Sequence, residues 1–352
     1  MKRPSWIPPS KSPLGRASPY AFLLAAVALV ASGWYLGTHY NWRMVWDVLR
    51  KVDIAWLLLG GLGAVAIQTT FRSMRSMVLL RALDHQLPFF EIYRTTVFAA
   101  GVNCLTPFQA GELLRAEMWH AHGITRHSGY GVVVIERVLD LATIILLAQL
   151  ALVFDSSLRP ALPIHYLLPG LLVLAGVAVA GFLVLRSLAA RRPAVDRWYR
   201  PLRQCATCPR ALSIAVLFGL AAWTAVGTGW WFAFHSTGAR LGLSQSIAAL
   251  SVSTLASLMT FVPAGLGVAE SSVAFILSCT GVPSATALAG ALLLRLYGAL
   301  PALFATFHLA SPVFRHTKLP TFANTPDEEE DDEENDVPYS EEPAPAQPRT
   351  DK

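Results

Sequence analysis

Long apolar runs are the feature of this chain that most restricts how it can fold. Several of them approach the roughly 20 residues that a helix needs to cross the hydrocarbon core of a membrane. The composition agrees, because 54% of the 352 residues are hydrophobic and only 14% are charged. Soluble domains rarely combine these values. We therefore expect an all-α, polytopic integral membrane protein.

Uninterrupted and interrupted runs predict two kinds of element. Two interrupted stretches contain helix-breaking proline or glycine, at about residues 95–114 and 244–280. The first uninterrupted run is longer than the core of a usual signal peptide, so we expect a retained anchor. Six runs predict full crossings, at about residues 19–37, 54–70, 129–154, 164–185, 211–235 and 285–310.

The distribution of basic residues predicts the orientation of these crossings. Lys and Arg gather in residues 1–18, 71–94 and 186–210, whereas the loops at 155–163 and 236–243 each hold one Arg. Basic loops favour the cytoplasmic side. We therefore expect a bacterial-type plasma (inner) membrane protein with both termini in the cytoplasm.

This orientation makes the two interrupted stretches enter the membrane from opposite faces. Each would enter and leave on the same side, as a re-entrant hairpin of two broken helices. Broken helices that meet near the midplane from opposite sides are typical of inverted-repeat transporters. The alternative interpretation is that each stretch forms ordinary spans kinked at proline.

The last residues differ sharply from the apolar body. Residues 319–352 hold 12 Asp and Glu against two basic residues, a net charge of −10 within a chain whose total is +5. Like charges repel and little apolar surface is available for burial, so we expect this tail to be disordered. The expected organisation is a basic segment (1–18), a transmembrane domain (19–311) and this acidic tail.

The first interrupted stretch carries charged residues in apolar sequence. Glu112 and Arg115 are three apart and share one face of a helix. The following span carries Glu136, Arg137 and Asp140, of which the first and last also share a face. Charges at membrane depth cost roughly 2.5–3.5 kcal/mol each on insertion scales, so they mark a functional site by default. Asn103 precedes them, and the expected structural breakers are Pro107 and Gly111.

The second interrupted stretch repeats this arrangement. Glu270 follows three expected breakers, Pro263, Gly265 and Gly267. Arg295 lies in the middle of the last predicted span, 25 residues after Glu270. The same spacing of 25 separates Glu112 from Arg137.

Two interpretations of these acid–base pairs remain open. In the first, each pair is a buried salt bridge that locks two helices together. In the second, the arginines bind the phosphate of a lipid headgroup as bidentate donors, and the glutamates pair with them when the site is empty. The candidate headgroup-binding residues are Asn103, Glu112, Arg115, Glu136, Arg137, Asp140, Glu270 and Arg295.

At these motifs the chain resembles a known family. The order N-x-x-x-P-x-x-x-G-E-x-x-R, E-R-x-x-D and P-x-G-x-G-x-x-E, over about residues 20–310, is similar to the transmembrane region of lysylphosphatidylglycerol synthases and its stand-alone, flippase-like relatives. Arg72 and Arg75 also fit an arginine-containing segment of this family. The resemblance implies a lipid translocase fold with two re-entrant helix pairs. Because a short acidic tail follows the last span here, we expect no soluble aminoacyl-transferase domain.

Together these features predict a lipid translocase that moves an anionic phospholipid or a polyprenyl-phosphate-type lipid between leaflets. The alternative is an accessory subunit that transports nothing and presents a lipid to a glycosyltransferase or synthase. A lipid-modifying enzyme that uses Glu112, Glu136 and Asp140 as acid and base is a weaker alternative, since no nucleophile or metal motif accompanies them. We therefore expect no enzymatic activity, no cofactor, no metal and no nucleic acid partner.

Overall fold

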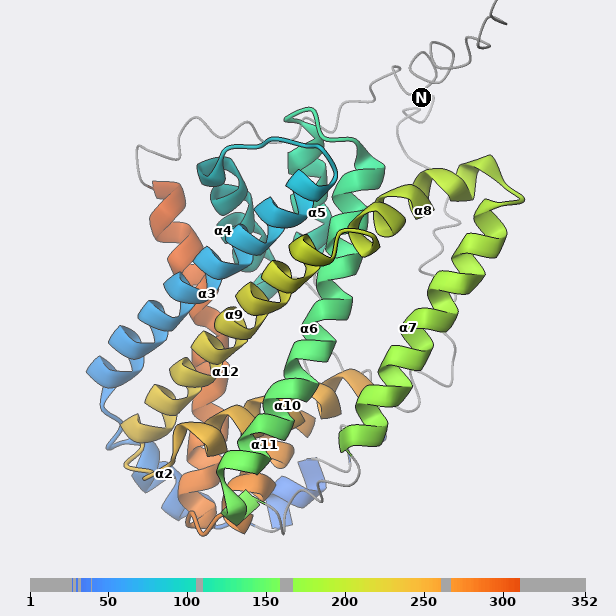
Figure 1. Cartoon of the computed structure of the whole chain (residues 1–352). Coiled ribbons are helices and arrows are strands. Elements are labelled where there is room, and N and C mark those ends of the chain that lie inside the picture. The colour runs from blue at the N-terminus through green and yellow to red at the C-terminus, as the bar shows by residue number, and fades with distance from the viewer. Residues whose placement is uncertain are drawn as a thin grey trace, which may run out of the picture. The chain divides into compact units, whose positions relative to one another are not determined.

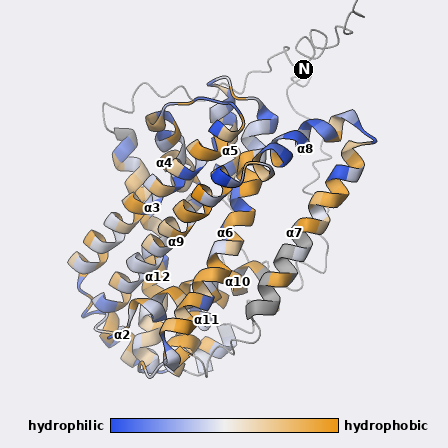
Figure 2. Cartoon of the chain, viewed as in Figure 1, coloured by the Kyte–Doolittle hydropathy of each residue, from blue (hydrophilic) through white to orange (hydrophobic). Residues whose placement is uncertain are grey.

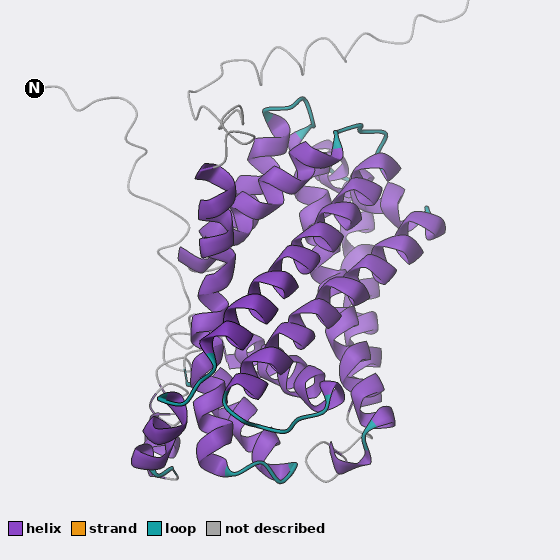
Figure 3. Cartoon of the chain, turned by 90° about the vertical axis from the view of Figure 1, so that its left-hand side faces the viewer, coloured by secondary structure: helices purple, strands orange, loops and turns teal. Residues whose placement is uncertain are grey.

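The computed structural model describes residues 40–105, 110–158, 167–260 and 267–310, with short pieces between 27 and 38. Every regular element in these ranges is a helix, as Figure 3 shows. The expected all-α architecture is therefore confirmed. The predictions for the basic segment 1–18 and for the acidic tail 319–352 lie outside the described residues.

The helices follow one another with short connections (Figure 1). The described part of the connection after residue 154 contains a 3-10 turn, η3 (Ser156–Leu158). The α-helices of the described ranges are α2 (Trp42–Leu49), α3 (Ile54–Ala82), α4 (Phe89–Leu105), α5 (Ala110–His120), α6 (Arg126–Phe154), α7 (Leu167–Ala189), α8 (Pro193–Ala206), α9 (Pro209–Ser236), α10 (Leu243–Thr260), α11 (Val268–Cys279) and α12 (Ser284–Ala310).

Three helices of the described part combine the length and the apolar composition needed to cross a membrane. They are Ile54–Ala82, Pro209–Ser236 and Ser284–His308. Two more of the six predicted spans coincide with α6 and α7, which are 29 and 23 residues long. The predicted span at 19–37 falls mostly outside the described residues. Figure 2 shows much of α9 as hydrophobic, whereas α8 is largely hydrophilic.

Helices α3 and α9 run side by side in opposite directions along most of their length (Figure 1). The backbone amide of Asp53, just before α3, donates to the carbonyl of Ser236 at the end of α9 (3.0 Å). Glycine permits this close packing, since a Cβ added at Gly60 would lie only 2.2 Å from the Phe232 ring. The pair forms one wall of the site described below.

The two interrupted stretches each form a pair of short helices that pack on one another. Helices α4 and α5 form the first pair, and α10 and α11 the second. The pairs lie at opposite ends of the helical bundle (Figure 1). Gly267, directly before α11, has a φ of +77°, a backbone conformation that glycine adopts without strain. That these pairs enter and leave a membrane on one side stays a prediction.

One predicted boundary is wrong in a way that matters for the site. The sequence predicts that the second span ends at residue 70 and that a basic loop follows, but α3 continues to Ala82. Arg72 and Arg75 therefore lie inside a helix, with side chains 16% and 0% exposed. Their charge, which ended the apolar run, is matched by carboxylates of other helices. These arginines no longer support the orientation derived from basic loops, which stays a prediction.

Candidate functional site

Glu112 lies at the centre of a group of polar side chains from four helices. Its Oε1 accepts hydrogen bonds from Nη2 of Arg72 on α3 (2.7 Å) and Nδ2 of Asn103 on α4 (3.1 Å). Nη2 of Arg115, three residues further along α5, lies 2.9 Å from Oε2. Nη2 of Arg137 on α6 lies 3.9 Å from Oε1. A single buried carboxylate thus contacts three arginines.

Glu136 holds the deepest part of this arrangement, with a side chain 0% exposed. It accepts hydrogen bonds from Arg115 and from the hydroxyl of Ser76 on α3 (2.6 Å to Oε1). Nε of Arg75 lies 3.6 Å from the same oxygen. The Arg115 guanidinium also stacks over the ring of Trp119, 4.8 Å from its centroid, which adds a cation–π contact. These interactions join α3, α5 and α6.

Asp140 extends the network toward α9. Its Oδ1 accepts from Nη1 of Arg75 (2.6 Å) and from the indole nitrogen of Trp223 (2.8 Å). Its Oδ2 lies 2.9 Å from Nη2 of Arg137, one helical turn away on α6. We call these charged residues the arginine–carboxylate cluster: Arg72, Arg75, Arg115, Arg137, Glu112, Glu136 and Asp140.

The second half of the chain supplies one ion pair. Nε of Arg295 on α12 donates to Oε1 of Glu270, in the first turn of α11. A carboxylate in this position interacts favourably with the helix dipole. The Glu270 side chain is 6% exposed, whereas that of Arg295 is 35% exposed. Arg295 thus has a buried partner and also a surface that a ligand can reach.

A cavity of about 550 Å³ brings the two halves together. The arginine–carboxylate cluster contributes Arg72, Arg137 and also the carboxylates Glu112 and Asp140 to its lining, and α12 contributes Arg295. Neutral polar side chains border the same space, among them Gln68, Thr69, Thr96 and Asn103. A cavity with three arginines, set among apolar helices, suits a ligand with an anionic group. Among the described residues, no group of His, Cys, Asp and Glu is arranged to hold a metal ion.

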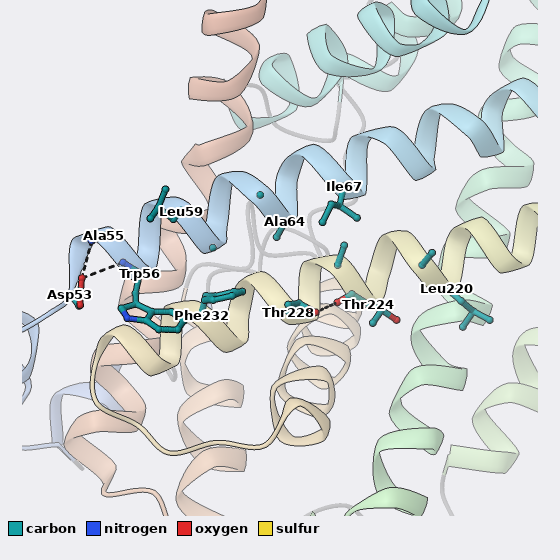
Figure 4. Close-up of a pocket in the computed structure, with 14 residues that line it drawn as sticks. Asp53, Ala55, Trp56, Leu59, Ala64, Ile67, Leu220, Thr224, Thr228 and Phe232 are labelled. Carbon is teal, nitrogen blue, oxygen red and sulfur yellow. Dashed lines mark hydrogen bonds between the residues drawn. The ribbon is translucent and has the colours of Figure 1, made fainter.

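A larger groove of about 930 Å³ lies on another face of the α3–α9 pair (Figure 4). Trp56 and Phe232 stack across one end, with ring centroids 5.2 Å apart. Two of the polar groups that border it are used locally: Asp53 caps α3, and the Thr228 hydroxyl donates to the carbonyl of Thr224 (2.9 Å). The groove is lined by no cationic side chain that could bind an anion, and the smaller cavity is therefore the candidate site.

A comparison with known families agrees with this geometry. The family described as the lysylphosphatidylglycerol synthase TM region matches residues 21–305. The chain belongs to this family. Membership supports an integral membrane protein with a lipid-related role. No curated protein matches the chain.

Within this family fold, the cavity is lined by five of the predicted site residues. The five are Asn103, Glu112, Arg137, Asp140 and Arg295. Arg115 and Glu270 do not line it but contact residues that do, and Glu136 contacts Arg115. Asn103, Glu112 and Arg137 lie around the same oxygen, Glu112 Oε1. Their predicted role in binding a headgroup stays a prediction. Four contributors were not among the predicted site residues: Arg72, Arg75, Ser76 and Trp223. A signal exists for three of them, because Arg72, Arg75 and Ser76 lie at positions i, i+3 and i+4 and so share one face of a helix.

The expected breakers differ in their outcomes. Gly111 lies inside α5, and a Cβ there would lie 2.2 Å from the carbonyl oxygen of Ala99 on α4. Its observed role is therefore to let α4 and α5 approach closely, and its role as a breaker stays a prediction. Gly267 lies directly before α11, and its own φ is positive. Pro107, Pro263 and Gly265 lie outside the described residues.

Proposed function

We propose that this protein moves an anionic lipid, either a phospholipid or a polyprenyl-phosphate-type lipid, between the two leaflets of a membrane. The observation that carries this proposal is that Arg72 and Arg137 from one half and Arg295 from the other line a single cavity. Arginines at membrane depth are costly, so three of them around one space indicate a site for an anion. The family supports a role with lipids.

In this proposal the lipid phosphate enters the cavity and the hydrocarbon chains stay in the surrounding lipid. The guanidinium groups of Arg137 and Arg295 donate to the phosphate oxygens, since planar guanidinium groups match phosphate geometry. Glu112 and Glu270 hold these arginines when no headgroup is bound. Movement of one half against the other then exposes the cavity to each leaflet in turn.

We place the protein in a bacterial-type plasma membrane with both termini in the cytoplasm. The basic residues of 1–18 and 186–210 support this orientation, because such loops favour the cytoplasmic side. The proposal contains no chemical step on the lipid. An accessory role, in which the protein only presents the lipid to a synthase or glycosyltransferase, is the competing outcome of the test below.

The test uses purified protein reconstituted into liposomes that contain a fluorescent phosphatidylglycerol. A membrane-impermeant quencher reports how fast the label moves between leaflets. We expect wild type to accelerate this movement and Arg295→Gln to abolish it, since the substitution removes a cationic donor of the cavity. The control is Arg200→Gln on α8, where the same change affects a side chain that is 76% exposed.

Each result decides between the candidate roles. Loss of movement in Arg295→Gln but not in Arg200→Gln supports the translocase, provided that both variants insert into the liposomes. Normal movement in Arg295→Gln contradicts the proposed site. If wild type binds phosphatidylglycerol but accelerates no movement, the accessory role is favoured instead.

A further inference from the structure

The segment that joins α7 to α9 carries arginines that the candidate site does not use. Residues 191–210 hold six arginines, all of them exposed, and one acidic residue, Asp196. Arg200 pairs with Asp196 one helical turn away (2.7 Å), and Arg197 has a further interaction of its own. The other four form no ion pair with any residue that the structure describes. We call them the α8 arginines: Arg191, Arg192, Arg203 and Arg210.

These arginines lie where two predicted spans leave the membrane. Helix α7 has 23 residues and is about 35 Å long, close to the hydrocarbon thickness of about 30 Å, so both of its ends lie near the headgroups. Arg191 and Arg192 come just after α7, and Arg210 is the second residue of α9. Arginine side chains are long enough to extend from such positions to the headgroups.

Helix α8, which carries Arg203, is fixed to the protein along one face. A Cβ added at Gly131 on α6 would lie 2.9 Å from the Pro201 side chain, so α8 and α6 pack closely. Nε2 of Gln204 donates to Oδ2 of Asp84, just after α3 (2.9 Å). The remaining surface of α8 is largely hydrophilic, as Figure 2 shows. The buried side chains of α8 are Tyr199, Pro201 and Cys205.

Trp198 favours a lipid surface over a soluble acidic partner. This residue of α8 is 46% exposed, and its ring meets His127 edge-on, with centroids 4.6 Å apart. Tryptophan is enriched where helices meet the membrane interface, and helices that combine arginine with tryptophan bind anionic interfaces. Anionic headgroups also complement the charge of the arginines.

We propose that the α8 arginines bind anionic lipid headgroups in the leaflet next to α8, at a surface separate from the cavity. None of the four lines the cavity, and the inference does not depend on the proposed function. The attraction is by charge, so phosphatidylserine and phosphatidylglycerol, which carry equal net charge, bind alike. Salt weakens it, because exposed charges are screened.

The test measures which lipid gathers beside α8 in vesicles. The full-length protein carries a fluorophore attached through Ala194→Cys, at an exposed position of α8, with Cys104→Ser, Cys208→Ser and Cys279→Ser. The vesicles contain phosphatidylcholine and phosphatidylserine with identical acyl chains, and one of the two is brominated so that it quenches the fluorophore. We expect phosphatidylserine to quench at least about fivefold more effectively, which corresponds to about 1 kcal/mol, and high salt to reduce this preference.

Two sets of substitutions show whether the α8 arginines cause the preference. Replacing all four by Gln should lower it to less than about twofold, whereas replacing all four by Lys should keep most of it because the charge stays. The control for position is the same fluorophore attached through Met44→Cys, an exposed residue of α2. Helix α2 precedes the start of α3, whereas α8 contacts its end, so quenching at Met44 should not change with the α8 arginines.

Three results would overturn this inference. They are equal quenching by both lipids in wild type, an unchanged preference in the Gln variant, and equal losses in the Gln and Lys variants. The first two would favour an acidic protein segment as the partner of these arginines. Should the Gln variant not fold, as judged by size-exclusion chromatography, Arg191→Gln with Arg192→Gln replaces it, with a smaller loss expected. None of these outcomes bears on translocation, which Arg295→Gln tests.

Discussion

Nη2 of Arg72 lies 2.7 Å from Oε1 of Glu112, although 40 residues separate them in the chain. The contact joins the spanning helix α3 to the short helix α5. A phosphate placed beside Arg72 would compete with Glu112 for the same guanidinium. Binding of an anion and the attachment of α5 to α3 are therefore coupled in this geometry.

Removal of Arg115 should destabilise the protein strongly. Its side chain is 0% exposed and contacts both Glu112 and Glu136. Breaking a buried ion pair by removing one partner costs about 3–5 kcal/mol, because the remaining charge is buried without compensation. We expect Arg115→Met to lower the unfolding temperature of the detergent-solubilised protein clearly, as measured by differential scanning fluorimetry.

The control for this prediction is Arg200→Met. Arg200 forms an exposed pair with Asp196 one helical turn away (2.7 Å), and such pairs contribute only about 0.3–0.5 kcal/mol. A double variant, Arg115→Met with Glu136→Gln, should recover part of the lost unfolding temperature, because it removes one of the two carboxylates that lose their partner. Equal unfolding temperatures for Arg115→Met and Arg200→Met would show that the buried contacts contribute little.

Two glycines allow the cavity and the groove to be tested separately. Gly298 lines the cavity and Gly63 lines the groove, and a Cβ added at either position meets no atom within 4 Å. We expect Gly298→Phe to weaken binding of labelled phosphatidylglycerol at least about tenfold, or about 1.4 kcal/mol, because the ring fills space near Arg295. Gly63→Phe should bind as wild type does. The reverse result would move the site to the groove.

Cys104 provides a reporter inside the cavity. Its side chain borders the cavity and is exposed, whereas Cys205 is buried. In a variant with Cys208→Ser and Cys279→Ser, we expect a small membrane-permeable maleimide to label Cys104. Saturating phosphatidylglycerol should slow this labelling because the headgroup excludes the reagent from the cavity. Mass spectrometry of the labelled peptide measures the rate.

The matched control for this experiment retains Cys279 and replaces Cys104 and Cys208 by Ser. Cys279 is exposed at the end of α11 and does not line the cavity. Its labelling rate should not depend on phosphatidylglycerol. Protection of Cys279 and Cys104 to the same extent would indicate a general effect of the lipid on the detergent micelle.

The ion pairs within one helix could be predicted from sequence, because residues three apart share a helical face. Glu112 and Arg115 are three apart, and so are Arg137 and Asp140, and both pairs are in contact. The pair of Glu270 and Arg295 was found because each charge lies in apolar sequence, and a buried charge needs a partner.

The contribution of α3 to the site could not be predicted from the lengths of the apolar runs. A span predicted from an apolar run ends at the first cluster of charges, which leaves Arg72 and Arg75 in the segment that follows it. The helix continues because Asp140 and Glu112 neutralise these arginines from other helices. Only tertiary structure brings those carboxylates close. The role of Trp223, whose indole donates to Asp140, was missed for the same reason.

The hydrogen bonds of Asp155, outside the predicted site, predict how the stability of the protein depends on pH. Asp155, directly after α6, accepts hydrogen bonds from the Ser157 hydroxyl (2.6 Å) and the Ser157 amide (3.0 Å). Its Oδ2 accepts from the hydroxyl of Ser244, at the start of α10 (3.1 Å). These hydrogen bonds, that of the Ser157 hydroxyl first, lower the pKa of Asp155 below its ordinary value of 3.8 because they favour the charged form.

A lowered pKa in the folded state stabilises the fold above pH 3.8, and this contribution is lost as the pH falls through the folded-state pKa. We therefore expect Asp155→Asn to reduce the unfolding temperature well above pH 3.8, and the difference from wild type to vanish at lower pH. Asp47→Asn, at an exposed position of α2, is the control for removing a carboxylate. A difference for Asp155→Asn that stays constant with pH would mean that the charge of Asp155 does not stabilise this connection.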